Sequence, residues 1–443
     1  MKVNDPMGPD IPRRLPDLDP HDPLPPITEK QLARLWQRRA ARSRSLRTEH
    51  GHRIQVLYPG RPGVTAGPDF RDALLLVEEQ GLVQGDVEVH LRQQDWRSHG
   101  HHVDPNYNGV ALHVALETTG APADTASGGE PPLAGLRGLL DDPPAEDSTD
   151  EDSTGEVRDH LWRLLERQGY RRPHTAERMA ALLNRAGDER FLGRSLVLQR
   201  LMSEQEPAQT LWESICEALG YRHNQHAFLQ LAIAAPIHTL EYMARRIPLS
   251  ERNAVLSAAL LRLAGFGGYQ RPNPSHRTLA KFGPPLDAAQ WKLFRVRPSN
   301  HPRRRVVGAA GLLTRFADEG LLPGLARAAA AGNPSALTEA LSVGSDAENG
   351  AALIGAGRAR DIAVNAVLPF LHGLASLADE AGRSREMLEL YRQYGKLTEN
   401  EITRELESAL QPRKWGRVAR TARQQQGLIH LQRLLAGAAN PGR

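Results

Sequence analysis

The chain has 443 residues, enough for two or three domains at the usual size of roughly 150 residues each. Hydrophobic residues make up 40% and charged residues 24%, which excludes a fibrous or fully disordered protein. No apolar run approaches the roughly 18 residues that cross a bilayer, and the first ten residues lack the apolar segment of a secretory signal. The single cysteine, Cys216, excludes an internal disulfide and a cysteine-rich zinc site. Together these features predict a soluble, cytoplasmic protein with no membrane partner.

The net charge of +4 conceals a strong segregation of charge. Residues 121–157 hold ten acidic residues and one basic residue, so this segment carries −9 and the rest of the chain +13. The segment is also rich in Pro, Gly, Ser and Thr, which predicts a largely disordered acidic loop. A basic body with such a loop is compatible with binding a polyanion such as nucleic acid. An equally good interpretation is that the loop only keeps the protein soluble.

The N-terminal part of the chain mixes one helix with several strands. Eight prolines in residues 1–26 predict an extended, poorly ordered arm. Thr28 is a good N-cap, and the apolar residues after it predict a helix that runs into the forties. Turns containing glycine separate the first three of four strand-like segments, which are 52–60, 71–79, 84–92 and 109–117. This order predicts an α+β domain over residues 27–120, closed by residues 131–140 beyond a loop.

From residue 158 the pattern changes to amphipathic segments rich in Ala and Leu at helical period. These segments continue almost to the last residue, and the last helix is expected over residues 415–436. No repeat of fixed period is sustained, which disfavours a regular solenoid. The predicted fold class is therefore an α+β N-terminal domain followed by a large all-α domain over residues 158–443.

Residues able to carry chemistry gather between positions 67 and 113. Asp86, Glu88 and His90 alternate along one strand-like segment, so their side chains are expected on one face while the valines between them enter the core. Asp69 stands just before the neighbouring strand and is expected to meet Glu88 across the hairpin. Such a polar face is either a solvated edge or a metal site.

Five of the 17 histidines fall within residues 90–113. Imidazoles and carboxylates at this density suit a divalent cation, which takes nitrogen or oxygen ligands and can activate a water molecule. The additional candidates in this segment are Asp86, His99, His101, His102, Asp104 and His113. The alternative is that the histidines cap turns and satisfy buried backbone groups.

The sequence Pro-Asp69, a strand, and then Glu88-x-His90 resembles the motif of the PD-(D/E)XK nuclease superfamily. The resemblance implies that Asp69 and Glu88 bind Mg²⁺ or Mn²⁺ and that His90 stands where a lysine positions or activates water. Histidine can act as a base near neutral pH, but the replacement also fits a lost activity or another metal. The preceding helix would supply an accessory acid, for which Glu29 and Glu49 are the candidates.

A longer resemblance covers most of the chain. Residues 67–114 and four later pieces resemble the bacterial domain-of-unknown-function 2851 (DUF2851) family; the later pieces are 218–232, 294–312, 362–371 and 425–431. Membership implies no activity, because the name of the family records none. The acidic segment and the proline-rich arm look peculiar to this chain.

Two basic clusters in the helical region are candidates for contact with a phosphate backbone. Arg303, Arg304 and Arg305 follow a turn-like stretch. Lys414, Arg417 and Arg420 recur every three residues on the expected last helix and would share one face of it. The alternative for each cluster is a solvated helix face.

The sequence excludes the common nucleotide cofactors. It contains no G-x-x-x-x-G-K-[ST] loop for ATP or GTP, and no strand precedes the glycines at 265–268, so a dinucleotide is not expected either. The leading hypothesis is a metal-dependent phosphodiesterase acting on nucleic acid, with Asp69, Glu88 and His90 as catalytic residues and Mg²⁺ or Mn²⁺ as the cofactor.

Two alternatives remain open. One is a binding or scaffold protein in which a polar network holds the loop 93–108 in place; its members would be Asp86, Glu88, His90 and His113. The other is a metal-dependent hydrolase of a small substrate. A catalytic site predicts that the acids and His90 converge in an open cleft, whereas a scaffold predicts buried groups that satisfy one another.

Overall fold

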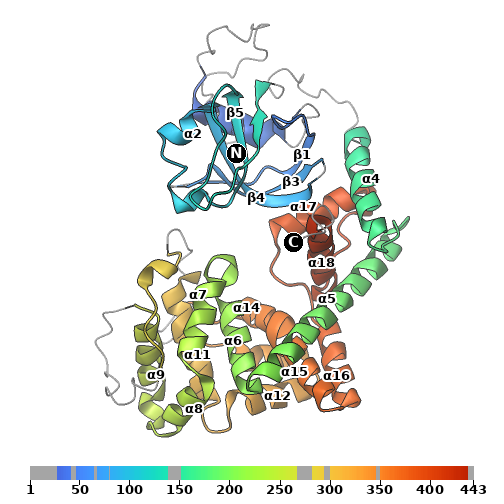
Figure 1. Cartoon of the computed structure of the whole chain (residues 1–443). Coiled ribbons are helices and arrows are strands. Elements are labelled where there is room, and N and C mark those ends of the chain that lie inside the picture. Colours follow the sequence, from blue (N-terminus) through green and yellow to red (C-terminus); the bar gives the residue numbers. More distant parts are fainter. Residues whose placement is uncertain are drawn as a thin grey trace, which may run out of the picture. The chain divides into compact units, whose positions relative to one another are not determined.

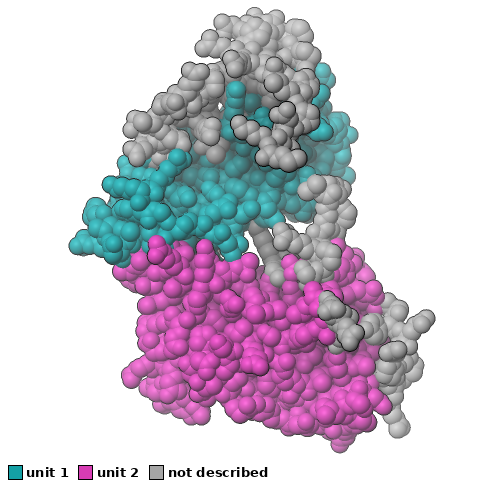
Figure 2. All heavy atoms as spheres, turned by 180° about the vertical axis from the view of Figure 1, so that it is seen from behind, with its two compact units in different colours: residues 1–179, 399–418, 428–443 teal, residues 180–398, 419–427 magenta. Residues whose placement is uncertain are grey.

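A computed structural model describes residues 27–40, 46–63, 67–78, 80–137, 151–266, 282–293, 300–345 and 350–437. The expected arm (1–26) and the part of the acidic loop at 138–150 lie outside the described residues. The chain divides into two compact units, shown in Figure 2. Unit 1 comprises residues 1–179, 399–418 and 428–443, and unit 2 comprises residues 180–398 and 419–427. These units do not coincide with the division at residues 157 and 158 that composition suggested.

Unit 1 begins with the expected helix, α1 (Glu29–Arg39). The Thr28 hydroxyl accepts a hydrogen bond from the Gln31 N–H, and the Gln31 side chain accepts one from the Thr28 N–H, which forms a capping box. The apolar face of the helix turns Leu32 and Trp36 into the core. The helix ends at Arg39, before the forties in which the sequence placed its end.

The sheet of unit 1 contains the four expected strands, β1 (Ile54–Tyr58), β3 (Phe70–Val77), β4 (Gly81–Arg92) and β5 (Val110–Glu117). The first three form an antiparallel meander, and β5 then pairs with β4 in parallel (Figure 1). Two short strands complete the sheet: β2 (Arg61–Pro62) pairs with β3, and β6 (Leu133–Gly135) pairs with β5. The expected α+β fold of this region is confirmed.

Helices from distant parts of the chain complete unit 1. α4 (Glu151–Arg167) begins before the expected boundary at residue 158, and α17 (Glu401–Leu410) contacts both α4 and β1. The buried indole of Trp162 donates to the Leu410 carbonyl at 2.8 Å, and the Tyr58 hydroxyl donates to Glu401 at 2.7 Å. The first of these hydrogen bonds joins α17 to α4, and the second joins it to β1.

The all-helical region predicted by the sequence is confirmed. Its helices are α5 (Ala176–Glu204), α6 (Pro207–Leu219), α7 (Tyr221–Ala234), α8 (Ile237–Arg245), α9 (Leu249–Leu263), α11 (Pro302–Arg315), α12 (Leu321–Ala330), α13 (Pro334–Leu341), α14 (Ala356–Ile362), α15 (Leu368–Leu377), α16 (Ala381–Arg392) and α18 (Ala422–Gly437). Trp212, Phe228 and Phe370 lie in the core of unit 2, and Cys216 is buried in the same core. Among the described residues, we find no helix with the length and apolar character needed to cross a membrane.

Candidate functional site

The β3–β4 hairpin brings the two predicted metal ligands together. Phe70 pairs with Val87 in its register, so Asp69 lies beside Glu88. The Asp69 N–H donates to Glu88 Oε2 at 2.8 Å, and Asp69 Oδ2 accepts from the Val89 N–H at 3.1 Å. Burial is the main cause that holds the pKa of each carboxyl well above its usual range, and the nearby Glu88 adds to the shift of Asp69.

The polar face of β4 is buried rather than solvated. Glu88 is 5% exposed and His90 1% exposed. The parallel neighbour β5 places His113 opposite Glu88, and His90 Nδ1 lies 2.9 Å from His113 Nε2 in a hydrogen bond between the two rings. Burial is the first cause that lowers the pKa of both histidines far below the usual value, so both imidazoles are neutral.

The loop after β4 covers this face. It contains α2 (Asp95–Ser98) and the short η2 helix (Pro105–Tyr107). Trp96 is buried, and its indole N–H donates to the Asp124 carbonyl at 2.7 Å. Its ring packs edge-on against His101, with ring centroids 5.5 Å apart, and the Tyr107 ring stacks on the same imidazole with centroids 3.8 Å apart. The two aromatic rings therefore hold His101 of the loop in place.

Three histidines and one carboxylate converge under the loop, and we call Glu88, His90, His99 and His101 the histidine cluster. Glu88 Oε1 lies 3.2 Å from His101 Nε2 and 3.6 Å from His90 Nε2. One ring nitrogen from each of the three histidines lies within 4.8 Å of the others. The Nε2 atoms of His90 and His101 are buried, yet neither makes a hydrogen bond with the described residues. Nitrogen and carboxylate ligands in this arrangement fit a divalent cation.

Access to the histidine cluster is from the side of His99, whose side chain is exposed while those of the other three members are buried. The predicted convergence of Asp69, Glu88 and His90 is found, with Glu88 and His90 buried and Asp69 partly buried. The role of base fits His90 less well than expected, because Nδ1 is bonded to His113 and Nε2 faces Glu88.

Asp86 lies apart from the histidine cluster. Its Oδ1 accepts a hydrogen bond from the Asp72 N–H at 3.0 Å, and Asp72 forms an ion pair with Arg61 at 2.5 Å. Asp72 has a φ of 61°, a left-handed conformation that is strained for a residue with a side chain. The pattern along the chain gave no signal for this second polar group, which depends on an irregularity in the pairing of β3 with β4.

The remaining candidates of the segment take other positions. Asp104 caps the η2 helix by accepting from the Asn106 N–H at 2.9 Å. His113 lies behind His90 and supports its ring. His102 is half-buried and stands outside the group of three histidines.

Of the two candidates for the accessory acid, Glu29 is the one near the site. Its charge, in the first turn of α1, contributes to raising the pKa of both Asp69 and Glu88. Glu49 lies in the turn before β1, 3.7 Å from the His50 ring.

The first basic cluster has structural partners. Arg303, Arg304 and Arg305 stand at the start of α11, and each donates to a main-chain carbonyl oxygen of a neighbouring segment. Arg305 is buried, and it reaches the Leu353 carbonyl at 2.8 Å. These contacts anchor α11 and leave Arg305 unable to track a phosphate backbone.

The second basic cluster does not lie on a helix face, so that prediction is wrong. Lys414 is in the η6 turn (Arg413–Trp415), Arg417 and Arg420 follow in an extended stretch, and α18 begins only at Ala422. Arg417 pairs with two acids of unit 1, Glu399 and Glu407. Gly416, with a φ of 61°, interrupts the helical pattern that the spacing of three suggested.

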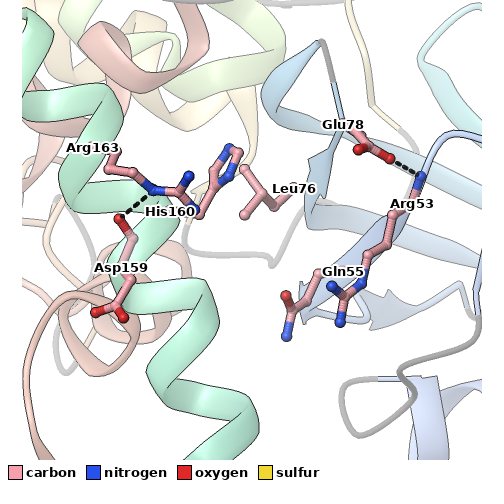
Figure 3. Close-up of a pocket in the computed structure, with 7 residues that line it drawn as sticks. All are labelled: Arg53, Gln55, Leu76, Glu78, Asp159, His160 and Arg163. Carbon is pink, nitrogen blue, oxygen red and sulfur yellow. Dashed lines mark hydrogen bonds between the residues drawn. The ribbon is translucent and has the colours of Figure 1, made fainter.

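Unit 1 also contains a cavity of about 500 Å³ that the sequence did not indicate. Figure 3 shows its lining, which comes from β1, β3 and α4: Arg53, Gln55, Leu76, Glu78, Asp159, His160 and Arg163. Arginines and acids are matched in number here, and the Glu78 carboxylate already accepts from the Arg53 N–H at 2.9 Å. No member of the histidine cluster lines this cavity.

Comparison with known proteins gives one match. A family model described as "Protein of unknown function (DUF2851)" matches residues 29–400, which include the histidine cluster and most of unit 2. No curated protein and no solved structure matches the chain.

Proposed function

The chain belongs to the DUF2851 family, and from that premise we propose that it is a metal-dependent phosphodiesterase acting on nucleic acid. The observation that carries the proposal is that two neighbouring acids, the buried Glu88 and the partly buried Asp69, lie beside imidazole nitrogens that are buried without a hydrogen bond to the described residues. A cation bound there would lower the pKa of a water molecule and offset negative charge on a phosphodiester.

The chain's own groups have distinct roles in this proposal. Glu88 and His90 help to hold the cation, since their donor atoms face each other. Asp69 is only partly buried, and it takes the proton from the water whose oxygen attacks phosphorus. The bond from phosphorus to the leaving oxygen then breaks, and that oxygen takes a proton from solvent.

The hydrogen bonding supports this proposal over the scaffold alternative. A purely structural network should satisfy its own buried donors and acceptors. The His90–His113 contact does so for one nitrogen of each ring. The other nitrogens of both rings, and His101 Nε2, are buried without a hydrogen bond to the described residues.

Exposed basic residues on α1 support nucleic acid as the substrate. Lys30, Arg34 and Arg38 are exposed and recur every four residues along α1, so they share one face. The first turn of the same helix holds Glu29, which lies close enough to influence both acids. Cations on such a face can contact successive phosphates without reading the base sequence.

The test is cleavage of DNA and RNA by the purified chain with Mg²⁺, Mn²⁺ or Zn²⁺. We expect Glu88→Gln to lower the rate by at least about 100-fold, and Glu117→Gln, on the exposed end of β5, to keep it. Circular dichroism checks that both variants are folded. A Glu88→Gln rate equal to that of the wild type would contradict the proposal.

A second substrate class separates the proposal from its nearest alternative. The burial of Glu88 and His90 also suits a small molecule that can enter past His99. Bis(p-nitrophenyl) phosphate is a small phosphodiester that tests this. Cleavage of it, with no cleavage of any polynucleotide, would favour the small-substrate hydrolase.

A further inference from the structure

We infer that the histidine cluster is a site for a nitrogen-preferring transition-metal ion of the Zn²⁺ and Co²⁺ class, rather than the Mg²⁺ that the two acids alone would suggest. The ligands are His90, His99, His101 and Glu88. The inference rests on the proposed function only for what the ion is used for, since the site itself follows from the geometry.

The distances agree with a four-ligand site. Tetrahedral zinc with ligands at roughly 2.0–2.1 Å requires ligand atoms about 3.3 Å apart. Glu88 Oε1 lies 3.2 Å from His101 Nε2 and 3.6 Å from His90 Nε2, which brackets that value. One nitrogen from each of the three histidines lies within 4.8 Å of the others. Glu88 is not part of that group, so a four-ligand set requires the exposed His99 ring to move toward Glu88.

The surroundings orient the ligands. His113 is fully buried on β5 and holds the Nδ1 of His90 at 2.9 Å, so Nδ1–H of His90 can donate to it and leave the Nε2 lone pair directed toward Glu88. A metal-bound imidazole in proteins commonly donates its other N–H to such a partner. The Tyr107 ring, stacked on His101, limits the rotation of that imidazole.

The donor set decides the class of ion. Mg²⁺ takes oxygen ligands and keeps several waters, whereas imidazole suits zinc, cobalt, iron and nickel. Three of the four ligands here are imidazoles, and Glu88 forms an ion pair with no Lys or Arg among the described residues. The exposure of His99 gives water or substrate a route to the ion, whose coordination can expand from four to five ligands during a reaction.

The test uses Co²⁺, whose visible absorption reports its ligands. Metal-free full-length chain is titrated with CoCl₂, and Zn²⁺ and Mg²⁺ are then used as competitors. We expect one Co²⁺ per chain with intense visible bands, displaced by equimolar Zn²⁺ but not by millimolar Mg²⁺. His90→Ala and His99→Ala should each weaken Co²⁺ binding by about 100-fold or more.

Three further points about the histidine variants separate loss of the metal site from loss of folding. His99 is exposed, so His99→Ala will fold even if His90→Ala does not. His50→Ala is the matched control, because His50 is an exposed histidine of unit 1 outside the site. His102→Ala should bind as the wild type does, and a loss there would overturn the assigned ligand set.

Three results overturn the inference: no Co²⁺ binding by the folded wild type, binding unchanged in both His90→Ala and His99→Ala, or loss of binding in His102→Ala. These are distinct from failure of the proposed function. Tight Co²⁺ binding without cleavage of any phosphodiester would support the site and contradict the activity. Cleavage supported by Mg²⁺ alone, without Co²⁺ binding, would do the reverse.

Discussion

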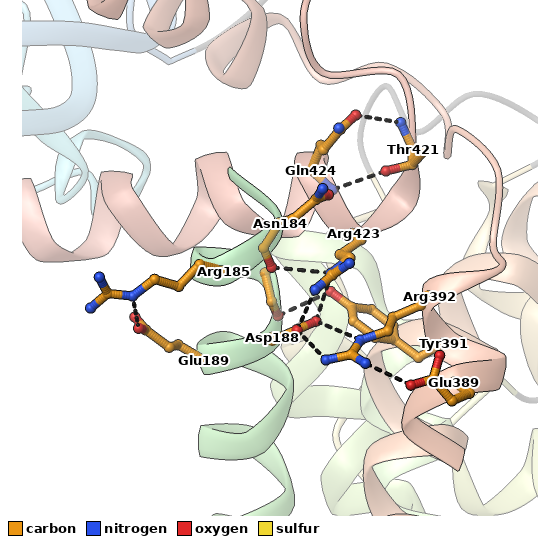
Figure 4. A network of polar contacts seen from close by, with 11 residues as sticks. Asn184, Arg185, Asp188, Glu189, Glu389, Tyr391, Arg392, Thr421, Arg423 and Gln424 are labelled. Atoms are coloured by element: carbon orange, nitrogen blue, oxygen red, sulfur yellow. Dashed lines mark hydrogen bonds and ion pairs between the residues drawn. The ribbon is translucent and has the colours of Figure 1, made fainter. Parts of the chain in front are cut away.

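Unit 1 and unit 2 each contain a cluster of charged or titratable side chains, most of them at least partly buried. The two clusters differ in whether their polar atoms have hydrogen-bond or ion-pair partners. In unit 2, both oxygens of Asp188 are used by two arginines (Figure 4). Arg392 reaches it at 2.5 Å, and Arg423 donates from two nitrogens. In unit 1, the histidine cluster surrounds one carboxylate with imidazole nitrogens, two of which make no hydrogen bond among the described residues.

The difference separates a structural cluster from a functional one. The two guanidinium groups approach Asp188 as planar forks, which is the geometry that stabilises a carboxylate best. The Tyr391 hydroxyl beside them donates to the Gly187 carbonyl at 3.0 Å, so the neighbourhood is satisfied as well. Unpaired buried nitrogens cost stability, and proteins retain them mainly where a ligand completes the bonding.

The largest effect is expected from removing the ring that covers the histidine cluster. Trp96→Ala should lower the free energy of unfolding of unit 1 by about 3–5 kcal/mol, because it deletes a buried indole and leaves a cavity. It also frees the Asp124 carbonyl that the indole N–H occupies. Urea denaturation measures the loss. The control is Trp415→Ala, a partly exposed tryptophan of unit 1, which should cost far less; equal losses would show that Trp96 has no special role.

The next largest effect on stability is expected at Asp188, and the corresponding substitution at Glu88 provides a direct comparison. Asp188→Asn should destabilise unit 2 by about 2–3 kcal/mol, because two partly buried guanidinium groups would face each other without an anion. Glu88→Gln, in the metal-free chain, should leave the stability of unit 1 unchanged or raise it, since the buried Glu88 has no Lys or Arg partner among the described residues. Hydrogen exchange assigns each change to its unit.

If Glu88→Gln lowered the free energy of unfolding as much as Asp188→Asn does, the distinction between a structural and a functional cluster would fail. It would mean that Glu88 stabilises the fold in the way Asp188 does. The two substitutions are matched, since each replaces one carboxylate oxygen by an amide NH₂ group and removes the negative charge.

Local pattern was sufficient to predict the strands and part of the site. Alternation along residues 84–92 placed Glu88 and His90 on one face, and the short hairpin required Asp69 to lie beside Glu88. The capping box at Thr28 is equally local, because its partner is three residues away. The pairing of β4 with β5, which lie on either side of the covering loop, was not predicted and is seen only in the structure.

Contacts between residues far apart in the sequence could not be predicted from local sequence pattern. The loop carrying His99 and His101 folds back over β4 because Trp96 and Tyr107 are buried against it, and no periodicity reports that packing. Asp188 meets Arg423 across 235 residues of sequence. The spacing of Lys414, Arg417 and Arg420 gave a helical signal that Gly416 cancels through its left-handed backbone.

A smaller loss of stability is expected from removing the N-cap of α1, which the sequence predicted at Thr28. Thr28→Ala should destabilise unit 1 by about 1 kcal/mol, because it removes the side-chain oxygen that caps α1. Thr28→Ser keeps that oxygen and is the matched control, expected within a few tenths of a kcal/mol of the wild type. Thermal denaturation measures both variants. If alanine and serine behave alike, the capping box contributes nothing measurable.

The smallest effect concerns Ser195 and the half-buried His372 in unit 2, which form a hydrogen bond to each other but no ion pair. The Ser195 hydroxyl lies 2.8 Å from His372 Nδ1, and the Phe191 ring packs edge-on against the same imidazole. Burial lowers the pKa of His372 below its usual 6.5. The unfolded chain therefore binds a proton at a higher pH than the folded chain does, and the free energy of unfolding must fall as the pH drops below about 6.5.

This contribution is fully present above pH 6.5 and is lost as the pH falls through the folded-state pKa of His372. Because the side chain is only half-buried, the change should stay below about 1 kcal/mol. His372→Gln removes the titrating group and keeps a polar side chain, so its stability curve should be flatter than that of the wild type between pH 7.5 and pH 5.5. Parallel curves would show that the Ser195–His372 pair does not sense pH. Unlike Asp188, whose charge is matched by two arginines, this pair would then stabilise unit 2 through its hydrogen bond alone.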